Sequence, residues 1–352
     1  MTLFPNQWIF TKEIGEGLLV KRFTVFILTL FVSSALNASV CERSNAMRVV
    51  LEDQLSKDCK DISLNDLSTI TELHFYESVL SETSSYFADL KSSDFKDLPN
   101  LRFLDLNWIY LENFPGDLFI EIPFLEMLHW GFGNLEAFDF KVDNPFRYLE
   151  KLKYLTLTNL KLKYIVPEIF SDLHNLEILS INHTDELPTK IHPKAFSQLK
   201  KLRVLRMLRP IKYSSKHINL FAENRNLEAI GLKFDPSSKF LPGGLFKELS
   251  SLKLLYLDSY GEPKISKYFF YGLKNLELLF LQEASFLQQV VPAHFSKMKK
   301  IKINFSGISF RYGASREVES LALKDKFPRH DICLEINSEG CGLEEVVKDV
   351  ND

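Results

Sequence analysis

The chain has 352 residues, of which 45% are hydrophobic and 25% are charged, a composition typical of a folded protein. Its formal net charge of −3 argues against a nucleic-acid-binding protein, because such proteins carry a strong basic excess. Length alone leaves room for two domains, so the number of folding units has to be inferred from the sequence pattern.

A short apolar run near the N-terminus predicts a secretory signal over residues 1–35. The run covers residues 23–36, follows Lys21 and Arg22, and ends in small residues suited to cleavage. It is shorter than the roughly 20 residues that a membrane-spanning helix needs, although an uncleaved signal anchor is the alternative. No second apolar segment of spanning length follows, so we expect the mature chain to have no membrane span and to be secreted.

The middle of the chain is built from a repeated motif. Leu152 and Leu176 each begin a copy of L-x-x-L-x-L, and each copy is followed by a proline and then by F-x-x-L. The first apolar position of the motif recurs at steps of 24 to 31 residues, at Ile70, Leu101, Leu125, Leu152, Leu176, Leu202, Leu227, Leu252 and Leu276. Self-similarity at such a period indicates a repeat architecture.

The closing F-x-x-L part of the motif keeps the same phase. Its phenylalanine recurs at Phe95, Phe119, Phe146, Phe170, Phe196, Phe246, Phe270 and Phe295, whereas Phe221 is followed by Asn224 where the aliphatic residue should be. We interpret each repeat as one coil, in which a short strand buries the leucines and a return segment buries the phenylalanine. A single coil cannot cover these side chains, so each coil needs its neighbours.

On these motifs the stretch from about Leu67 to Phe310 resembles the leucine-rich repeat family, in particular the repeats of about 24 residues in extracellular proteins such as Toll-like receptor ectodomains and Slit-like proteins. The resemblance implies an α/β solenoid: a horseshoe of about ten coils with a parallel β-sheet on its concave side and irregular or short helical segments on its convex side. The family's asparagine at the ninth motif position is missing here, and the residues found there include Ile109, Leu160 and Thr184. Its absence suggests a less regular array.

The four cysteines lie outside the repeats, as Cys41 and Cys59 before them and Cys333 and Cys341 after them. Secreted solenoids cover their open ends with small disulfide-braced caps. We therefore predict an N-terminal cap over residues 36–66, a repeat array over 67–310 and a C-terminal cap with an acidic tail over 311–352. Because the array separates the two cysteine pairs, we expect the disulfides to join Cys41 to Cys59 and Cys333 to Cys341.

In this architecture the third and fifth motif residues point out of the concave face and line up in rows across successive strands. The third-position row is apolar and reads Phe103, Met127, Tyr154, Ile178, Val204, Ala229, Leu254 and Leu278. The fifth-position row is mixed and reads His74, Asp105, His129, Thr156, Ser180, Arg206, Gly231, Tyr256 and Phe280. The apolar row reflects either the ordinary preference of strands or an exposed groove that a partner protein or lipid covers.

Two local clusters have both a functional and an ordinary interpretation. His74, Asp105 and His129 occupy one row on three strands, where they either hold a metal or change charge near pH 6.5, or form an ordinary polar row. A second, basic cluster surrounds the sixth strand and comprises Lys200, Lys201, Arg203, Arg206, Arg209, Lys212 and Lys216. It is either a solvated face or a site for an acidic group on a partner.

The sequence contains none of the common catalytic motifs, so we predict a binding protein that is not an enzyme and has no cofactor or resident metal. We expect it to recognise an extracellular macromolecule, a protein or alternatively a glycan or lipid, through the concave face, in adhesion, development or innate recognition. The alternatives are a structural component of matrix or secretion, and a membrane-anchored receptor ectodomain if residues 23–36 are not cleaved. Two N-x-S/T sequences predict glycosylation at Asn182 and Asn304.

Overall fold

A computed structural model describes residues 40–75, 90–107, 115–133, 140–141, 143–160, 162, 164–182, 189–259, 263–282, 302–304 and 331–333. The predicted signal over 1–35, Cys341 and almost all of the C-terminal cap therefore lie outside the described residues, so the predicted Cys333–Cys341 link is not tested. None of the described helices is long and apolar enough to cross a membrane.

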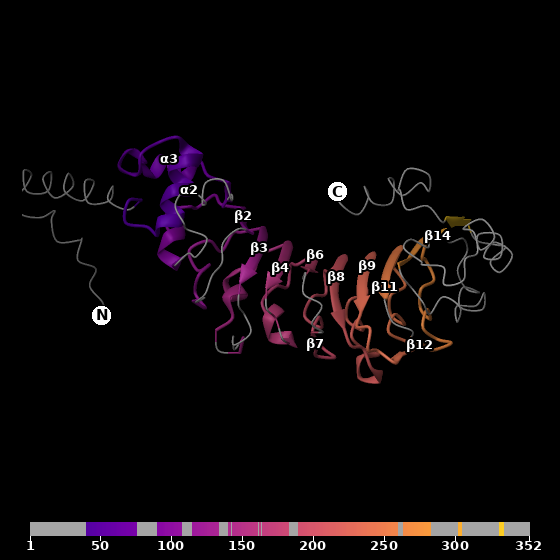
Figure 1. Ribbon diagram of the computed structural model, residues 1–352. Coiled ribbons are helices and arrows are strands. Elements are labelled where there is room, and N and C mark those ends of the chain that lie inside the picture. Colours follow the sequence, from indigo (N-terminus) through magenta and orange to yellow (C-terminus); the bar gives the residue numbers. More distant parts are fainter. Residues whose placement is uncertain are drawn as a thin grey trace, which may run out of the picture.

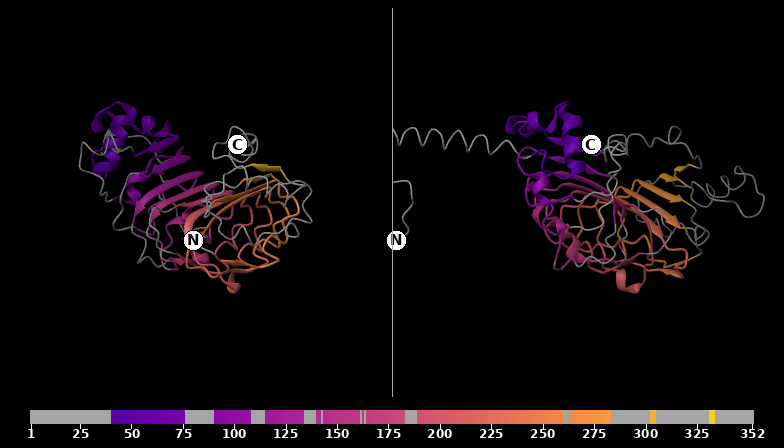
Figure 2. Two further views of the ribbon diagram at one scale, coloured as in Figure 1. Left: turned by 45° about the vertical axis from the view of Figure 1, so that its right-hand side comes forward. Right: turned by 60° about the vertical axis from the view of Figure 1, so that its left-hand side comes forward.

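The first described residues form a small helical cap. Its helices are α2 (Asn45–Leu55), η1 (Cys59–Asp61) and α3 (Leu64–Ser68). The Ser44 hydroxyl accepts from the Met47 N–H to begin α2, and a reciprocal Ser63–Asp66 capping box begins α3. A disulfide joins Cys41 to Cys59, as predicted. Both views in Figure 2 place this cap at one end of the array.

Eleven strands form one parallel sheet that runs the length of the array. In sheet order they are β1 (Glu72–His74), β2 (Phe103–Leu106), β3 (Met127–Gly133), β4 (Tyr154–Leu160), β6 (Ile178–Asn182), β8 (Val204–Ile211), β9 (Ala229–Phe234), β11 (Leu254–Ser259), β13 (Leu278–Gln282), β14 (Lys302–Asn304) and β15 (Asp331–Cys333). Figure 1 shows the array as a shallow arc with the main sheet along its upper side. Each strand pairs with the strand of the next coil, so the chain is a parallel β-solenoid.

The return segments between the strands contain little helix. They carry the short 3₁₀ helices η2 (Ser92–Phe95), η3 (Pro145–Tyr148), η4 (Pro167–Phe170) and η5 (Ser215–His217). Two small parallel sheets also form there, from β5 (Tyr164–Ile165) with β7 (Lys190–Ile191) and from β10 (Phe240–Leu241) with β12 (Lys264–Ile265). The expected number of about ten coils stays a prediction, because most of the chain after β13 lies outside the described residues.

The interior of the solenoid is filled as the motif predicts. Leu152, Leu155 and Leu157 are at most 1% exposed, and the motif phenylalanines from Phe95 to Phe270 are buried with them; Phe295 lies outside the described residues. Their rings contact one another from coil to coil: the ring centroids of Phe196 and Phe221 are 6.0 Å apart and the rings are stacked. Burial of such large side chains is the main stabilising contribution, and it is shared between neighbouring coils.

Asn224, the one polar residue at the closing motif position, has a specific structural role. Its side chain is fully buried, and its Nδ2 donates to the carbonyl oxygens of Phe196 at 2.9 Å and Leu199 at 2.8 Å in the preceding coil. A buried amide that donates two hydrogen bonds offsets much of its desolvation cost. Asn224 thus ties two coils together by polar contacts where other coils use an aliphatic side chain.

A row of asparagines takes part in holding the coils together, although the family's ninth-position asparagine is absent. These asparagines stand immediately before the first motif residue. Their Nδ2 groups donate to a backbone carbonyl of the preceding coil at 2.7 to 2.9 Å, in Asn100, Asn175, Asn226 and Asn275. Coil-to-coil amide bonds are therefore present at another position of the repeat.

Candidate functional site

The register of the main sheet confirms that the residues of each predicted row lie at equal positions on successive strands. Phe103 pairs with Met127, Met127 with Tyr154, and the row continues through Ile178, Val204, Ala229, Leu254 and Leu278. The fifth-position residues pair in the same way from His74 to Phe280. This register follows from the parity of L-x-x-L-x-L, since burying the leucines forces the residues between them outward.

The third-position row, however, does not form the exposed apolar groove that was one of its two interpretations. Val204, Ala229 and Leu278 are 7%, 4% and 2% exposed, and Phe103, Met127, Tyr154, Ile178 and Leu254 are half-buried. Neighbouring strands lie about 4.8 Å apart, so successive side chains of the row pack against one another. This packing favours the simpler interpretation, a row of residues suited to strands.

Three rings and one carboxylate gather at the first strands of the main sheet. The ring of Phe103 lies edge-on between two histidine rings, 4.8 Å from His74 and 5.0 Å from His129 by centroids. His129 Nδ1 is 3.8 Å from Asp105 Oδ2. Partial burial raises the pKa of the Asp105 carboxyl, but the nearby His129 ring and the hydrogen bond from the Asn107 N–H outweigh it, so this pKa lies below its ordinary value.

This group does not form a metal site. Among the described residues, the only three His, Cys, Asp or Glu side chains close enough to share an ion are Cys41, Asp58 and Cys59. Both of those cysteines are held in the disulfide, so their sulfurs are not available as thiolate ligands. The row of His74, Asp105 and His129 is best described as a polar and aromatic surface.

The rest of the fifth-position row is varied. Thr156 is half-buried, Ser180 is 7% exposed and Arg206 is exposed. Tyr256 and Phe280, both half-buried, have ring centroids 6.3 Å apart. Arg206 thus offers the row an exposed charge near its centre, and the two rings lie towards the C-terminal end.

The basic cluster predicted around the sixth strand is not a single basic face. Arg209 is 5% exposed, and its Nη1 lies at 3.5 Å from the carbonyl oxygen of Leu160. Lys201 donates to the Asn175 amide oxygen at 2.7 Å, and Arg203 is paired with acidic side chains. The cluster breaks up because adjacent residues of a strand point to opposite faces of the sheet.

A row that the sequence analysis missed lies beside the apolar row, at the second motif position. Its charges alternate in sign from strand to strand, through Arg102, Glu126, Lys153, Glu177, Arg203, Glu228, Lys253 and Glu277. We call this row the charge ladder. Like charges at equal positions of adjacent parallel strands would repel one another, and alternation removes that repulsion. The alternation is visible in the sequence once the second position of each repeat is read down the array.

Direct ion pairs join two parts of the charge ladder, Glu126 with Lys153 and the run from Glu177 to Lys253. Lys153 is 2.7 Å from Glu126, and Arg203 is 3.9 Å from Glu177 and 3.0 Å from Glu228. Lys253 Nζ is 3.4 Å from the other oxygen of Glu228. The hydrogen bond from Arg203 lowers the pKa of the Glu228 carboxyl, against the opposing effect of its partial burial.

The backbone under the charge ladder is equally regular. The carbonyl oxygen of Glu177 accepts from two N–H groups of the next coil, those of Arg203 at 2.8 Å and Val204 at 3.0 Å. Carbonyls of the second-position residues from Arg102 to Lys253 accept the same two bonds. These carbonyls, not the side chains alone, set the spacing of the ladder.

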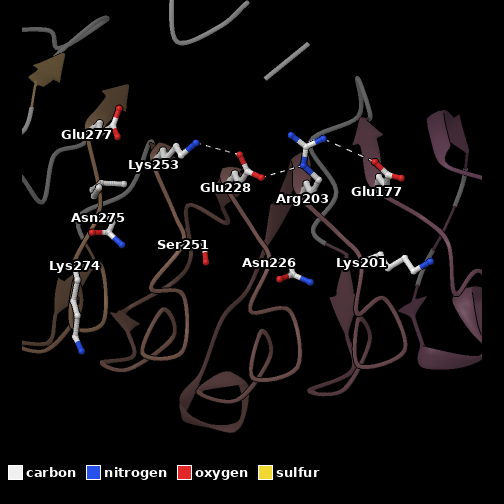
Figure 3. Close-up of a pocket in the computed structure, with 11 residues that line it drawn as sticks. Glu177, Lys201, Arg203, Asn226, Glu228, Ser251, Lys253, Lys274, Asn275 and Glu277 are labelled. Atoms are coloured by element: carbon white, nitrogen blue, oxygen red, sulfur yellow. Dashed lines mark hydrogen bonds and ion pairs between the residues drawn. The ribbon is translucent and has the colours of Figure 1, made fainter. Parts of the chain in front are cut away.

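An open groove of about 800 Å³ runs along the charge ladder, from Glu177 to Glu277. Figure 3 shows its two lining rows, with the ladder charges along one side and Lys201, Asn226, Ser251 and Asn275 along the other. Ten of its eleven lining residues carry polar or charged side chains, and the eleventh is Leu276. The groove therefore suits a polar partner surface better than an apolar ligand.

The two predicted glycosylation sites differ in what the structure describes. Asn182 is the last residue of β6, half-buried between Thr158 and Leu208 of the neighbouring strands. Its Nδ2, the atom to which a glycan would be attached, donates to the Ser180 hydroxyl at 3.0 Å. The backbone of Asn304 lies in β14, but its side chain is outside the described residues. Glycosylation of both residues stays a prediction.

Comparison with known proteins identifies the repeat itself. A family model described as "Leucine rich repeat" matches residues 150–208, the stretch that contains the two clearest copies of the motif. No curated protein sequence matches the chain. Among solved structures the fold is similar to that of an internalin (inlF) from Listeria monocytogenes, with 17% identity, a TM-score of 0.41, and coverage of 85% of this chain and 98% of the internalin.

Proposed function

The chain is a leucine-rich repeat protein, and we propose that it is a secreted binding protein that recognises another protein through the open face of its main sheet. Repeat solenoids present extended surfaces of this kind for binding. Across this face, aligned rows of outward side chains alternate between polar and half-buried apolar character. A non-catalytic role is the simplest one for such a chain.

The observation that carries this proposal is the polar groove at the edge of the face. It spans five strands and is lined by both signs of charge together with amide groups. Paired but half-exposed charges such as Arg203 and Glu228 can exchange partners with a complementary protein surface, which favours specificity over affinity. Arg206 and Tyr154 continue the same surface from the groove onto the sheet.

Two observations support secretion. The Cys41–Cys59 disulfide braces the cap, and structural disulfides persist in oxidising compartments. The short apolar run of residues 23–36 has the composition of a cleaved signal. An uncleaved run would make the same binding surface part of a membrane-anchored ectodomain.

Capture from extracellular fluid with the immobilised full chain tests the proposal. A double variant of the face, Tyr154→Ala with Arg206→Glu, should weaken retention of a captured partner at least tenfold, about 1.4 kcal/mol. Its matched control is Tyr164→Ala with Lys190→Glu, which changes the same kinds of exposed side chain on β5 and β7. Equal loss in both variants, or no loss in the face variant, would contradict recognition through this face. A chain that captures nothing would favour the structural role in matrix instead.

A further inference from the structure

Two neighbouring return segments, 239–250 and 263–274, carry a surface that the predicted concave face does not include. The only charged side chains on them are five lysines and one glutamate. The lysines are Lys239, Lys247, Lys264, Lys267 and Lys274, and all five are exposed. Three rings are exposed among them: Phe240 at 46%, Tyr268 at 56% and Tyr271 at 55%. We call this set of lysines and rings the basic–aromatic strip.

Backbone contacts hold the first halves of the two segments side by side. Phe240 pairs with Lys264 in the small sheet of β10 and β12. The Lys264 N–H donates to the carbonyl oxygen of Lys239 at 3.0 Å, so these two lysines are neighbours at one end of the strip. Farther along, the Gly244 N–H donates to the carbonyl oxygen of Tyr268 at 3.2 Å.

The second halves of the segments are in still closer contact. Gly272 has φ +107°, a conformation that favours glycine, and a Cβ there would collide with the backbone of Phe246 and Lys247. This approach brings the backbone of Lys247 close to that of Gly272, which follows Tyr271 directly and precedes Lys274 by two residues. A second pair of lysines thus lies at the other end of the strip, with the tyrosines between the two pairs.

Among the described residues, none of the five lysines of the strip forms an ion pair with a carboxylate. The one glutamate on the two segments, Glu248, lies 3.8 Å from Arg225. Lys267 Nζ lies over the Tyr268 ring at 4.9 Å from its centroid, a cation–π contact that presents the cation and the ring together. Exposed apolar rings surrounded by charge of one sign are unusual on a surface without a partner.

We propose that the basic–aromatic strip binds a linear anionic polysaccharide. Lysines at both ends supply compact cations for sulfate or carboxylate groups, and the rings between them offer flat apolar faces with hydroxyl edges for sugar rings. The contacts are spread along a strip two coils wide, which suits a polymer chain lying across it. An anionic bilayer would instead be contacted most simply by aromatic rings gathered at one protruding point of the protein surface.

The test measures binding of the full chain to a heparin-derived oligosaccharide. Wild type should bind it, should bind neutral dextran at least tenfold more weakly, and should lose affinity as salt rises, because exposed charges are screened. Lys264→Glu with Lys267→Glu should reduce the affinity at least tenfold, and Tyr268→Ala with Tyr271→Ala at least threefold. The control, Lys151→Glu with Lys190→Glu, changes exposed lysines elsewhere on the coils and should bind as wild type does.

Unfolding temperatures of all variants establish that each one is folded. An unchanged affinity in either folded strip variant would overturn the proposal, as would equal binding to neutral dextran. Binding to vesicles of phosphatidylserine and phosphatidylcholine without binding to the oligosaccharide would assign the strip to a membrane surface and would also overturn it. Lys274 of the strip also lines the groove beside the charge ladder, but none of the four residues changed in the two double variants lines that groove or lies on the main sheet. The outcome is therefore independent of protein recognition by the main sheet.

Discussion

The Arg203 guanidinium lies between two carboxylates of neighbouring coils, 3.0 Å from Glu228 and 3.9 Å from Glu177. One cation therefore connects three successive coils, at the residues that immediately precede strands β6, β8 and β9. Because these side chains are 27% to 43% exposed, each pair contributes at most about 1 kcal/mol. The longest run of these pairs joins Glu177, Arg203, Glu228 and Lys253 over four successive coils.

Removing the central cation should weaken the array modestly and in a salt-dependent way. We expect Arg203→Met to lower the free energy of unfolding by about 1 kcal/mol at low salt. The difference from wild type should shrink in about 1 M salt, where the Debye length is about 3 Å. Urea unfolding at both ionic strengths measures it. The control is Lys151→Met, which removes an exposed lysine outside the ladder and should show no salt-dependent difference.

The same pair predicts a dependence on acid. The Glu228 pKa is lowered by its hydrogen bond from Arg203, so ionised Glu228 stabilises the folded state above the ordinary glutamate pKa of about 4.3. That contribution is lost as the pH falls through the lower pKa of the folded state. The free energy of unfolding should therefore change less between pH 6 and pH 3 in Glu228→Gln than in wild type. Identical pH profiles for variant and wild type would contradict this role.

The rows of the main sheet could be predicted because L-x-x-L-x-L fixes which side chains are buried, and parallel pairing in register then aligns equal positions. Leu179 and Ser180 illustrate this parity: the leucine is fully buried in the interior, and the serine lies in the fifth-position row. What parity does not predict is how far a side chain is covered once its neighbours are in place. Ala229 points outward, yet only 4% of it is exposed.

The charge ladder and the basic–aromatic strip were missed for a different reason. Lys239 and Lys264 are 25 residues apart in sequence and become neighbours only through pairing of β10 with β12. Charges that lie close together in the sequence instead predicted a basic cluster. The strand divides that cluster between its two faces, since Arg206 is exposed and Arg209 is buried. Sites that extend over several coils of a solenoid have to be found by comparing residues one repeat apart, and not residues that are close together in the sequence.

Asn224 offers a test of buried polar bonding between coils. Asn224→Ala should destabilise the chain by about 2 kcal/mol, because it removes two hydrogen bonds from a fully buried position and leaves a void. Asn226→Ala is the matched control, since its amide makes one bond, to the Lys200 carbonyl, from an exposed position. That change should cost less than about 1 kcal/mol. Chemical denaturation of both variants gives the comparison, and equal losses would count against the role assigned to Asn224.

Export should leave a defined N-terminus. The apolar run of residues 23–36 ends in small residues, so N-terminal sequencing of protein from the medium should begin between Leu36 and Ser39. Recovery of the chain only in membranes, with Met1 retained, would show instead that the run acts as an anchor.

The N-terminal cap should depend on its disulfide as well as on the polar contacts that join it to the first coil. Arg43, 9% exposed, donates to the carbonyl oxygens of Asp94 and Lys96, each at 2.8 Å. Because these contacts already hold the cap, loss of the Cys41–Cys59 bond should loosen it without unfolding the array.

Replacing both cysteines by alanine removes a cross-link worth about 3 kcal/mol in the chain-entropy model. Hydrogen exchange should then rise in α2 and α3 while β8 and β9 stay protected, since distant coils of a solenoid open separately. Uniformly faster exchange along the whole array would mean that the cap controls the stability of every coil. Peptide mapping of the exported wild-type chain without reduction should show the Cys41–Cys59 link, and it also tests the predicted Cys333–Cys341 link.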